Sequence, residues 1–271
     1  MRFVTLRSEH GTSAGRVEGP DVVELDARDV REVLERLSEG SSVSETGTVL
    51  SRDAVDLAPV VPRPRKIFCV GLNYRAHILE MGREIPTAPT LFAKFDRALI
   101  GPVDDIVLPK ESEQVDWEVE LTLVIGRSVR RASADEAAEA IAGYTVGNDV
   151  SMRDWQWRTP EWLQGKTFES STPIGPELVT TDELSVENLE VLCEVDGEVM
   201  QRSRTSELVF SPADLVAYAS TIITLDPGDV IMTGTPGGVG GARKPPIFLK
   251  AGSEVRTTIE GIGSLVNRCV T

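Results

Sequence analysis

Asp116-Trp-Glu-Val-Glu-Leu-Thr-Leu-Val-Ile-Gly126 is the stretch of sequence that decides the fold class. Its apolar side chains at 117, 119, 121 and 123 alternate with Glu118, Glu120 and Thr122, which is the two-residue period of a β-strand. In such a strand both glutamates project from one face while the apolar residues pack on the other. The pattern therefore predicts a half-buried strand that holds two carboxylates about 7 Å apart, from a rise of roughly 3.4 Å per residue.

Outward from this strand, the chain beyond residue 65 is rich in short β-like runs and poor in helices. Asp196-Gly197 predicts a two-residue hairpin turn. Helix starts are indicated by Ser133 with Glu136 and by Ser211-Pro212. Because strands and helices do not alternate regularly, the sequence favours an α+β, mainly antiparallel β body over a doubly wound sheet. The predicted strands are 67–71, 119–125, 144–148, 190–195, 229–233, 254–259 and 264–270.

The first sixty residues predict a separate small unit of short strands and one helix. A helical stripe is formed by Val30, Val33, Leu34 and Leu37, and Gly40 bounds it. The segment 59–65 carries three prolines, which exclude a helix or a central strand and predict a stiff linker. We therefore expect a small amino-terminal domain, residues 1–60, and a larger domain, residues 65–271.

Composition and charge exclude several classes of protein. Of the 271 residues, 41% are hydrophobic and 26% are charged, which is typical of a globular chain. The net charge of −15 repels phosphate backbones and anionic lipid surfaces, so we expect neither nucleic acid nor a membrane as a partner. The three cysteines lack metal-binding or redox spacing, and no apolar run resembles a signal peptide or a membrane span. We expect a cytoplasmic protein.

The acidic residues of the deciding stretch admit two interpretations. Glu118 and Glu120 can lie on a solvated strand face, or they can be partly buried and require a cation between them. The segment 103–120 holds seven acidic residues and one lysine, which favours a cation there. Asp149 ends a second β-like run and can supply a third oxygen ligand or form a turn. With only two histidines in the chain, any metal site here would use carboxylates and a hard cation.

Three further features could carry chemistry. His77 and Glu80 stand three residues apart, so the carboxylate can orient the imidazole as a general base, although this spacing is also that of an ordinary surface pair. Lys166 can neutralise an anionic substrate or be solvated. Arg153 and Asp154 can form a structural ion pair. The glycine-rich run 233–241 lacks the residues of a phosphate loop or a dinucleotide fingerprint, which leaves a tight loop that can approach a ligand closely.

Six segments in this order resemble the fumarylacetoacetate hydrolase family over roughly residues 65–270. The resemblance implies a mixed β-roll, barrel-like catalytic domain, which is usually dimeric, so we expect a homodimer. In many bacterial members a small amino-terminal domain precedes it. The matching segments are 66–77, 116–120, 143–154, 165–168, 173–176 and 228–236.

The same resemblance implies roles for individual residues. It implies Mg²⁺ or Mn²⁺ on Glu118, Glu120 and Asp149, and it favours the cation site over the solvated interpretation. Glu169 departs from the aspartate common in relatives, and the tryptophan-rich segment 155–162 is expected to set specificity. The implied catalytic residues are His77, Glu80 and Lys166, and the implied substrate contacts are Gln156, Arg153 and Thr235.

The implied reaction is hydrolysis of a C–C bond in an acylpyruvate or 1,3-diketo acid, such as fumarylpyruvate, by water that His77 and Glu80 activate. An alternative uses the same metal-stabilised enolate without hydrolysis. It comprises oxaloacetate decarboxylation and isomerisation of 2-hydroxyhepta-2,4-diene-1,7-dioate or 5-carboxymethyl-2-hydroxymuconate. A third hypothesis is a catalytically silent metal-binding or scaffold protein, against which the His77–Glu80 pair argues. The expected partner is a small keto acid.

Overall fold

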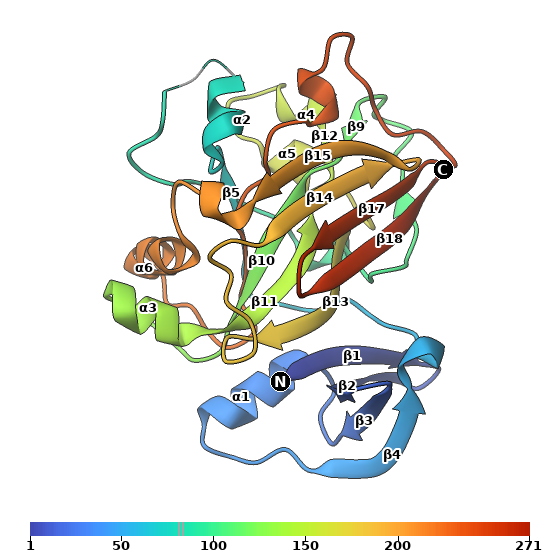
Figure 1. Ribbon diagram of the computed structural model, residues 1–271, viewed down its shortest axis with the longest axis vertical. Helices are drawn as coiled ribbons and strands as arrows, with labels where there is room; N and C mark the ends of the chain where they lie inside the picture. The colour runs from blue at the N-terminus through green and yellow to red at the C-terminus, as the bar shows by residue number, and fades with distance from the viewer. Residues whose placement is uncertain (81, 83) are drawn as a thin grey trace.

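The computed structural model describes residues 1–271 except 81 and 83, and it is built mainly from strands, as the sequence predicts (Figure 1). The helices are α1 (Val30–Ser38), α2 (Arg75–Glu80), α3 (Ala134–Ala140), α4 (Arg153–Gln156), α5 (Leu163–Lys166) and α6 (Pro212–Ile222). The strands are β1 (Arg2–Ser8), β2 (Gly11–Glu18), β3 (Asp21–Leu25), β4 (Glu45–Ser51), β5 (Ile67–Gly71), β6 (Thr90–Ala93), β7 (Leu99–Ile100), β8 (Ile106–Val107), β9 (Val115–Asp116), β10 (Val119–Ile125), β11 (Ile141–Asn148), β12 (Ser151–Met152), β13 (Thr172–Thr180), β14 (Glu190–Val195), β15 (Glu198–Arg204), β16 (Val230–Met232), β17 (Glu254–Ile259) and β18 (Gly263–Val270).

The largest sheet runs through the whole molecule. Its strands follow the order β4-β3-β2-β1-β13-β11-β10-β16-β5-β6, and β7 pairs with β13. At its centre β10 and β11 are antiparallel, with Val119 opposite Asn148. A five-stranded sheet has the order β15-β14-β17-β18-β8, and β9 pairs with β12. These sheets are open rather than closed into a barrel, so the mainly-β expectation is confirmed while the barrel-like closure is not found.

The main core explains why β10 sits at the centre of the molecule. Leu121 and Leu123 of β10 belong to one buried cluster with Val191 of β14 and Val255 of β17. Every residue of β10 is buried, whereas the alternating sequence predicts one solvated or partly buried face. The difference arises because β10 has sheet neighbours on both edges and is covered on both faces, so its polar residues are enclosed as well.

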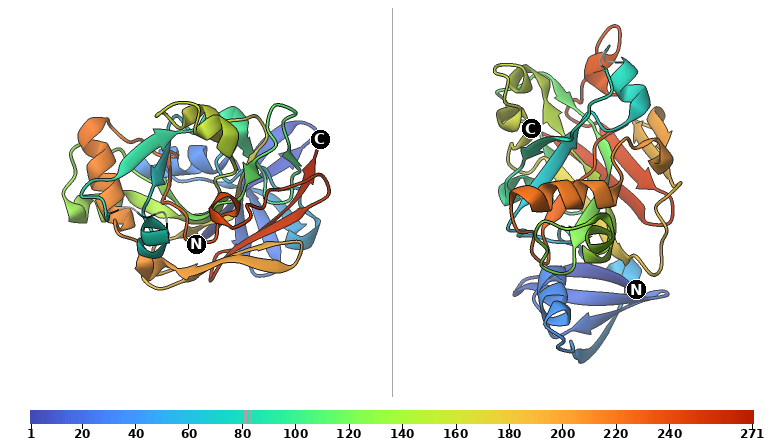
Figure 2. Two further views of the ribbon diagram at one scale, coloured as in Figure 1. Left: turned by 90° about the horizontal axis from the view of Figure 1, so that it is seen from above. Right: turned by 90° about the vertical axis from the view of Figure 1, so that its left-hand side faces the viewer.

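The helices begin where their capping residues predict. Ser133 and Glu136 form a capping box at the start of α3, and Ser211 and Asp214 form another at the start of α6. These two helices pack side by side on the body (Figures 1 and 2). The turn at Asp196-Gly197 joins β14 to β15, as expected of this dipeptide.

The amino-terminal helix begins at the predicted place. Asp29 caps α1 and accepts a hydrogen bond from the backbone N–H of Glu32 at 2.9 Å. Val30 and Val33 are buried as the stripe predicts, but Leu37 is 46% exposed because it lies in the last turn, beyond the body. No helix within the described part of the chain is long and apolar enough to cross a membrane.

The amino-terminal strands form one end of the molecule and are joined to the rest by β1 (Figures 1 and 2). In this strand Phe3 pairs with Leu178 of β13. Val60 and Val61 of the proline-rich segment are fully buried, so this segment packs against its surroundings. The division into domains 1–60 and 65–271 remains a prediction.

Candidate active site

Three acidic side chains converge where β10 begins and β11 ends. This part of the molecule, near α4 and α5, lies opposite the amino-terminal strands (Figure 1). The antiparallel register places Asp149 beside Glu118, and the Asp149 backbone N–H donates to the Glu118 carbonyl at 2.8 Å. Glu118, Glu120 and Asp149 each offer one ligand oxygen, and these atoms all lie within 4.8 Å of one another. Their exposures are 6%, 1% and 0%, so the solvated interpretation of this strand face is wrong.

Two cations neutralise Glu118. Lys166 Nζ lies 2.7 Å from Glu118 Oε2 and 2.7 Å from Asp149 Oδ2, and Arg153 Nη2 lies 2.6 Å from Glu118 Oε1. Burial raises the pKa of Glu118, but the charges of Lys166 and Arg153 outweigh it and bring that pKa to about 2. Lys166 is 2% exposed, so it is not a solvated lysine.

Glu120 lacks such neutralisation. It accepts a hydrogen bond from the Gly234 backbone N–H at 2.8 Å. Burial and then the charges of Asp149 and Glu118 raise the pKa of Glu120 well above its usual range. Asp149 Oδ1 is also buried, and although an ammonium group lies 2.7 Å away, this atom accepts no hydrogen bond of good geometry. A hard divalent cation fits this donor set, because it binds carboxylate oxygens and would offset the uncompensated charge.

Lys94 is a second buried ammonium group that the sequence analysis missed. It is 3% exposed, and its Nζ lies 2.7 Å from Asp149 Oδ1. It also donates to the carbonyls of Val150, at 3.3 Å, and Lys166. A signal was present in the sequence, since Leu-Phe-Ala-Lys-Phe (91–95) places one lysine inside an apolar run.

Asp116 anchors the glycine-rich loop to the site. It accepts hydrogen bonds from the backbone N–H groups of Gly240, at 2.7 Å, and Gly241, at 2.8 Å. A Cβ on Gly240 would lie 2.0 Å from the Ile247 carbonyl oxygen, which explains the glycine. Asp116 also accepts from Arg153 Nε at 2.8 Å, so Arg153 pairs with Asp116 and Glu118 and the alternative pair with Asp154 is wrong.

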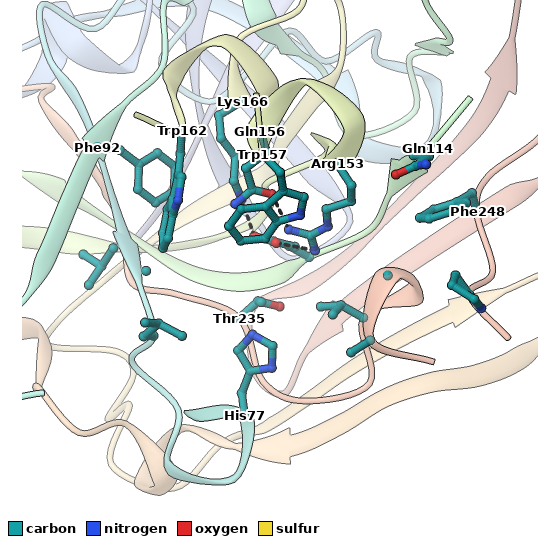
Figure 3. Close-up of a pocket in the computed structure, with 18 residues that line it drawn as sticks. His77, Phe92, Gln114, Arg153, Gln156, Trp157, Trp162, Lys166, Thr235 and Phe248 are labelled. Carbon is teal, nitrogen blue, oxygen red and sulfur yellow. Dashed lines mark hydrogen bonds and ion pairs between the residues drawn. The ribbon is translucent and has the colours of Figure 1, made fainter. Parts of the chain in front are cut away.

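A cavity of about 380 Å³ opens beside the acidic cluster (Figure 3). His77 lines it from α2 and is 8% exposed, so it is not an ordinary surface residue. Its Nδ1 lies 3.1 Å from Glu80 Oε2, the partner that the sequence predicts. Glu120 and Asp149, which are buried, and Glu80, which is exposed, are not among the lining residues. The predicted site residues that line the cavity are His77, Glu118, Arg153, Gln156, Lys166 and Thr235.

Two predicted substrate contacts already have protein partners. The Thr235 hydroxyl donates to the Val119 carbonyl at 3.0 Å and accepts from Gln201 Nε2 at 2.8 Å. Gln156 Oε1 accepts from Arg153 Nη1 at 2.8 Å. Thr235 therefore holds its loop against β10. The sequence analysis did not find Gln201, which binds the Thr235 hydroxyl.

The tryptophan-rich segment 155–162 supplies part of the cavity wall, as the sequence predicts for a specificity element. Trp157 and Trp162 line the cavity. Trp155 packs instead on Phe168, with ring centroids 5.4 Å apart, and lies outside the lining. Glu169, the departure noted in the sequence, is exposed and also lies outside the lining.

A carboxylate, an ammonium group, a guanidinium group and a histidine that line one cavity are typical of an enzyme for small polar molecules. The chain belongs to the fumarylacetoacetate hydrolase family, because the family model described as fumarylacetoacetate (FAA) hydrolase C-terminal matches residues 66–270. The resemblance seen in the sequence is confirmed.

Relatives align over the whole chain. The human protein named oxaloacetate tautomerase FAHD2A, mitochondrial, is 42% identical over 290 residues, which cover 100% of this chain and 92% of the relative. Two solved structures are each matched over 100% of this chain and 99% of their own chain. Fumarylacetoacetate hydrolase from Exiguobacterium antarcticum is 31% identical, with a TM-score of 0.90. The 5-carboxymethyl-2-hydroxymuconate delta-isomerase from Mycobacterium smegmatis is 37% identical, with a TM-score of 0.84.

Proposed function

We propose that this protein is a divalent-metal-dependent enzyme that moves a proton between carbon and oxygen in a 2-oxo acid. Oxaloacetate, after which a relative is named, is the first compound to assay. The observation that carries the proposal is the enclosed cluster of Glu118, Glu120 and Asp149 beside a cavity lined by His77 and Lys166. Relatives named as a tautomerase and as an isomerase support it, since both names describe movement of a proton. These names favour the non-hydrolytic alternative over acylpyruvate hydrolysis.

The chain's own residues divide the chemistry between two sides of the cavity. Glu80 binds His77 through Nδ1 and leaves Nε2 to take the proton from C3 of the substrate and return it to oxygen. Lys166 offers an ammonium group that balances negative charge on the substrate. The reaction is balanced without water, because the one proton that leaves carbon is delivered to oxygen.

Glu118, Glu120 and Asp149 would hold Mg²⁺ or Mn²⁺. Such a cation would supply Lewis-acid polarisation of the substrate's oxygen atoms. Arg153 and Asp116 would keep Glu118 in place, because the guanidinium bridges the two carboxylates. Lys94 would do the same for Asp149.

A second candidate function is hydrolysis of the C–C bond in an acylpyruvate, and the His77–Glu80 pair favours it. An imidazole oriented by a carboxylate can deprotonate water as well as carbon. The hydroxide would add to the carbonyl at C4 and the C3–C4 bond would break. The proton that His77 took from water would then go to C3, which gives a carboxylic acid and pyruvate.

The test uses the purified full-length protein with Mg²⁺ and three assays. Loss of enol absorbance reports oxaloacetate tautomerisation, coupled lactate dehydrogenase reports pyruvate release, and chromatography reports acid products from acetylpyruvate and fumarylpyruvate. We expect faster tautomerisation that is lost after chelation and restored by Mg²⁺. Cleavage of an acylpyruvate without tautomerisation would replace the first function by the second. Absence of turnover in all three assays would favour the catalytically silent protein.

A further inference from the structure

The cavity lining has a polar part and an aromatic part, and Figure 3 shows Phe92 and Trp162 beside Lys166, with Trp157 overlapping Lys166 in this view. One side carries the polar groups of Glu118, Lys166 and Arg153. The other is an aromatic wall, which we define as Phe92, Trp157 and Trp162. Oxaloacetate is a small dicarboxylate and has no apolar group that could pack against this wall. A substrate of this kind therefore does not account for the aromatic residues of the cavity.

The wall is built from rings that hold one another in place. Trp162 meets Phe92 edge to face at 5.5 Å between ring centroids, and it meets Trp157 edge to face at 6.0 Å. Gly71 on β5 makes room for it, because a Cβ there would lie 2.3 Å from Trp162 Cζ3. The strand, the neighbouring strand β6 and the segment before α5 therefore fit together around one indole ring.

Charge distinguishes the two sides further. Among the described lining residues, those that can carry positive charge are His77, Arg153 and Lys166, and none belongs to the wall. Lys166 Nζ stands 5.0 Å from the Phe92 ring centroid and marks the border between the sides. A carboxylate placed against the wall would lose its water without gaining a partner, whereas a planar apolar group would lose nothing.

We propose that the preferred substrate is a 2-oxo acid whose C3 carries a planar apolar group, such as a phenyl ring, and that Trp162 determines this preference. The inference rests on the proposed function for the 2-oxo acid end, which lies at the polar side. The apolar group packs on the aromatic wall. Trp162 immediately precedes α5 and Lys166 ends it, so one short helix sets the distance between the two ends of the substrate.

The test compares phenylpyruvate with oxaloacetate, which share the 2-oxo acid end and differ at C3, where one has phenyl and the other carboxylate. Tautomerisation of each is measured for the parent, Trp162→Leu and Trp157→Leu. Trp155→Leu is the matched control, because it removes an indole from the same segment but outside the cavity lining. We expect the parent to favour phenylpyruvate, and Trp162→Leu to lower the ratio of kcat/KM for phenylpyruvate over oxaloacetate about 10-fold through KM.

Trp155→Leu should keep the parent ratio. Trp157→Leu should lower the ratio too, so it serves as the second wall variant should Trp162→Leu fail to fold. Preference of the parent for oxaloacetate, or an unchanged ratio in both wall variants, would overturn the inference. Calorimetric titration of Mn²⁺-loaded protein with each acid distinguishes failure of the inference about the aromatic wall from failure of the proposed function. If neither acid is turned over, phenylpyruvate binding that weakens about 10-fold in Trp162→Leu still supports the wall, and phenylpyruvate binding that is absent or unchanged overturns it.

Discussion

Glu118 and Glu120 are two residues apart on one strand face, yet their acidities move in opposite directions. Burial raises the pKa of both, but Lys166 and Arg153 reverse the shift at Glu118 and bring it to about 2. At Glu120 the neighbouring Asp149 and Glu118 charges add to burial and raise the pKa further. The difference shows that the site has cations for some of its carboxylates and lacks one for the rest, which is why a divalent cation fits here.

Replacing Asp149 tests the proposed ligand set at its most enclosed member. Asp149→Asn keeps the side-chain volume and removes one anionic oxygen ligand, so we expect Mn²⁺ affinity to fall roughly 100-fold. Titration of free Mn²⁺ by electron paramagnetic resonance measures this without any assay of activity. Asp154→Asn is the control, since its carboxylate binds Ser112 at 2.6 Å and lies outside the triad. Parent affinity in Asp149→Asn would remove Asp149 from the ligand set.

Replacing His77 separates proton transfer from metal binding. His77→Ala removes the proposed base but none of the three carboxylates, so kcat should fall roughly 100- to 10,000-fold while Mn²⁺ affinity stays at the parent value. The control is His10→Ala, the chain's other histidine, which is exposed in the turn between β1 and β2. Undiminished kcat in His77→Ala would end its assignment as the base.

At the scale of elements, alternation and turn residues predicted seven of the fourteen strands that the structure describes beyond the linker. The run 119–125 is β10, 190–195 is β14 and 254–259 is β17, each with the predicted bounds. β13 was missed because Pro173 and Pro176 argue against a central strand, although β13 pairs with both β1 and β11. Periodicity reports which face a residue takes on its own strand but not which strand becomes its neighbour.

Because periodicity does not report contacts between distant parts of the chain, the sequence could predict some site residues and not others. The carboxylates and the His77–Glu80 pair were found because local spacing or family motifs mark them. Lys94 and Gln201 were missed because they act through contacts far along the chain. Lys94 binds Asp149 and Gln201 binds Thr235, and only the folded register brings these residues together.

Glu32 in α1 predicts how the stability of the fold depends on pH in the acid range. Hydrogen bonds from Arg28 and then Arg36 hold the pKa of Glu32 at about 2, below its ordinary value of 4.5. A lowered folded-state pKa means that the ionised carboxylate stabilises the fold above about pH 4.5, and that this stabilisation is lost as the pH falls toward 2. Glu32→Gln should lower the free energy of unfolding by about 0.5–1 kcal/mol at pH 7, a modest effect because solvent screens the pair.

Urea unfolding of the parent and Glu32→Gln at pH 7 and pH 3 checks this. The difference between the two proteins should shrink at the lower pH. Glu39→Gln, at an exposed position just after the same helix, is the control and should change little at either pH. A Glu32→Gln difference that stays constant with pH would contradict the assignment.

For the whole molecule, the contacts that join the amino-terminal unit to the body include a strand pair, a shared apolar cluster, the Arg7–Asp104 ion pair and one buried carboxylate. β1 continues the sheet through β13, which is next to the site-bearing strands β11 and β10. Glu177 of β13 is 1% exposed, and its carboxylate meets Arg2 of β1, at 3.2 Å, and Arg52 after β4. Two arginines of the amino-terminal unit therefore meet the body at a single carboxylate of β13, which is not among the residues that line the cavity.

Replacing Glu177 by glutamine leaves two arginines without their buried anion and keeps the side-chain volume. We expect the free energy of unfolding to fall by about 1–3 kcal/mol, because removing one partner of a buried pair costs more than the pair contributes. Urea denaturation followed by tryptophan fluorescence measures it, and Glu187→Gln at an exposed position should stay within about 0.5 kcal/mol of the parent. Since the cavity lies at the opposite end, Mn²⁺ affinity should not change in the folded variant. A Glu177→Gln protein as stable as the parent would mean that this carboxylate contributes nothing measurable to the joining of the unit to the body.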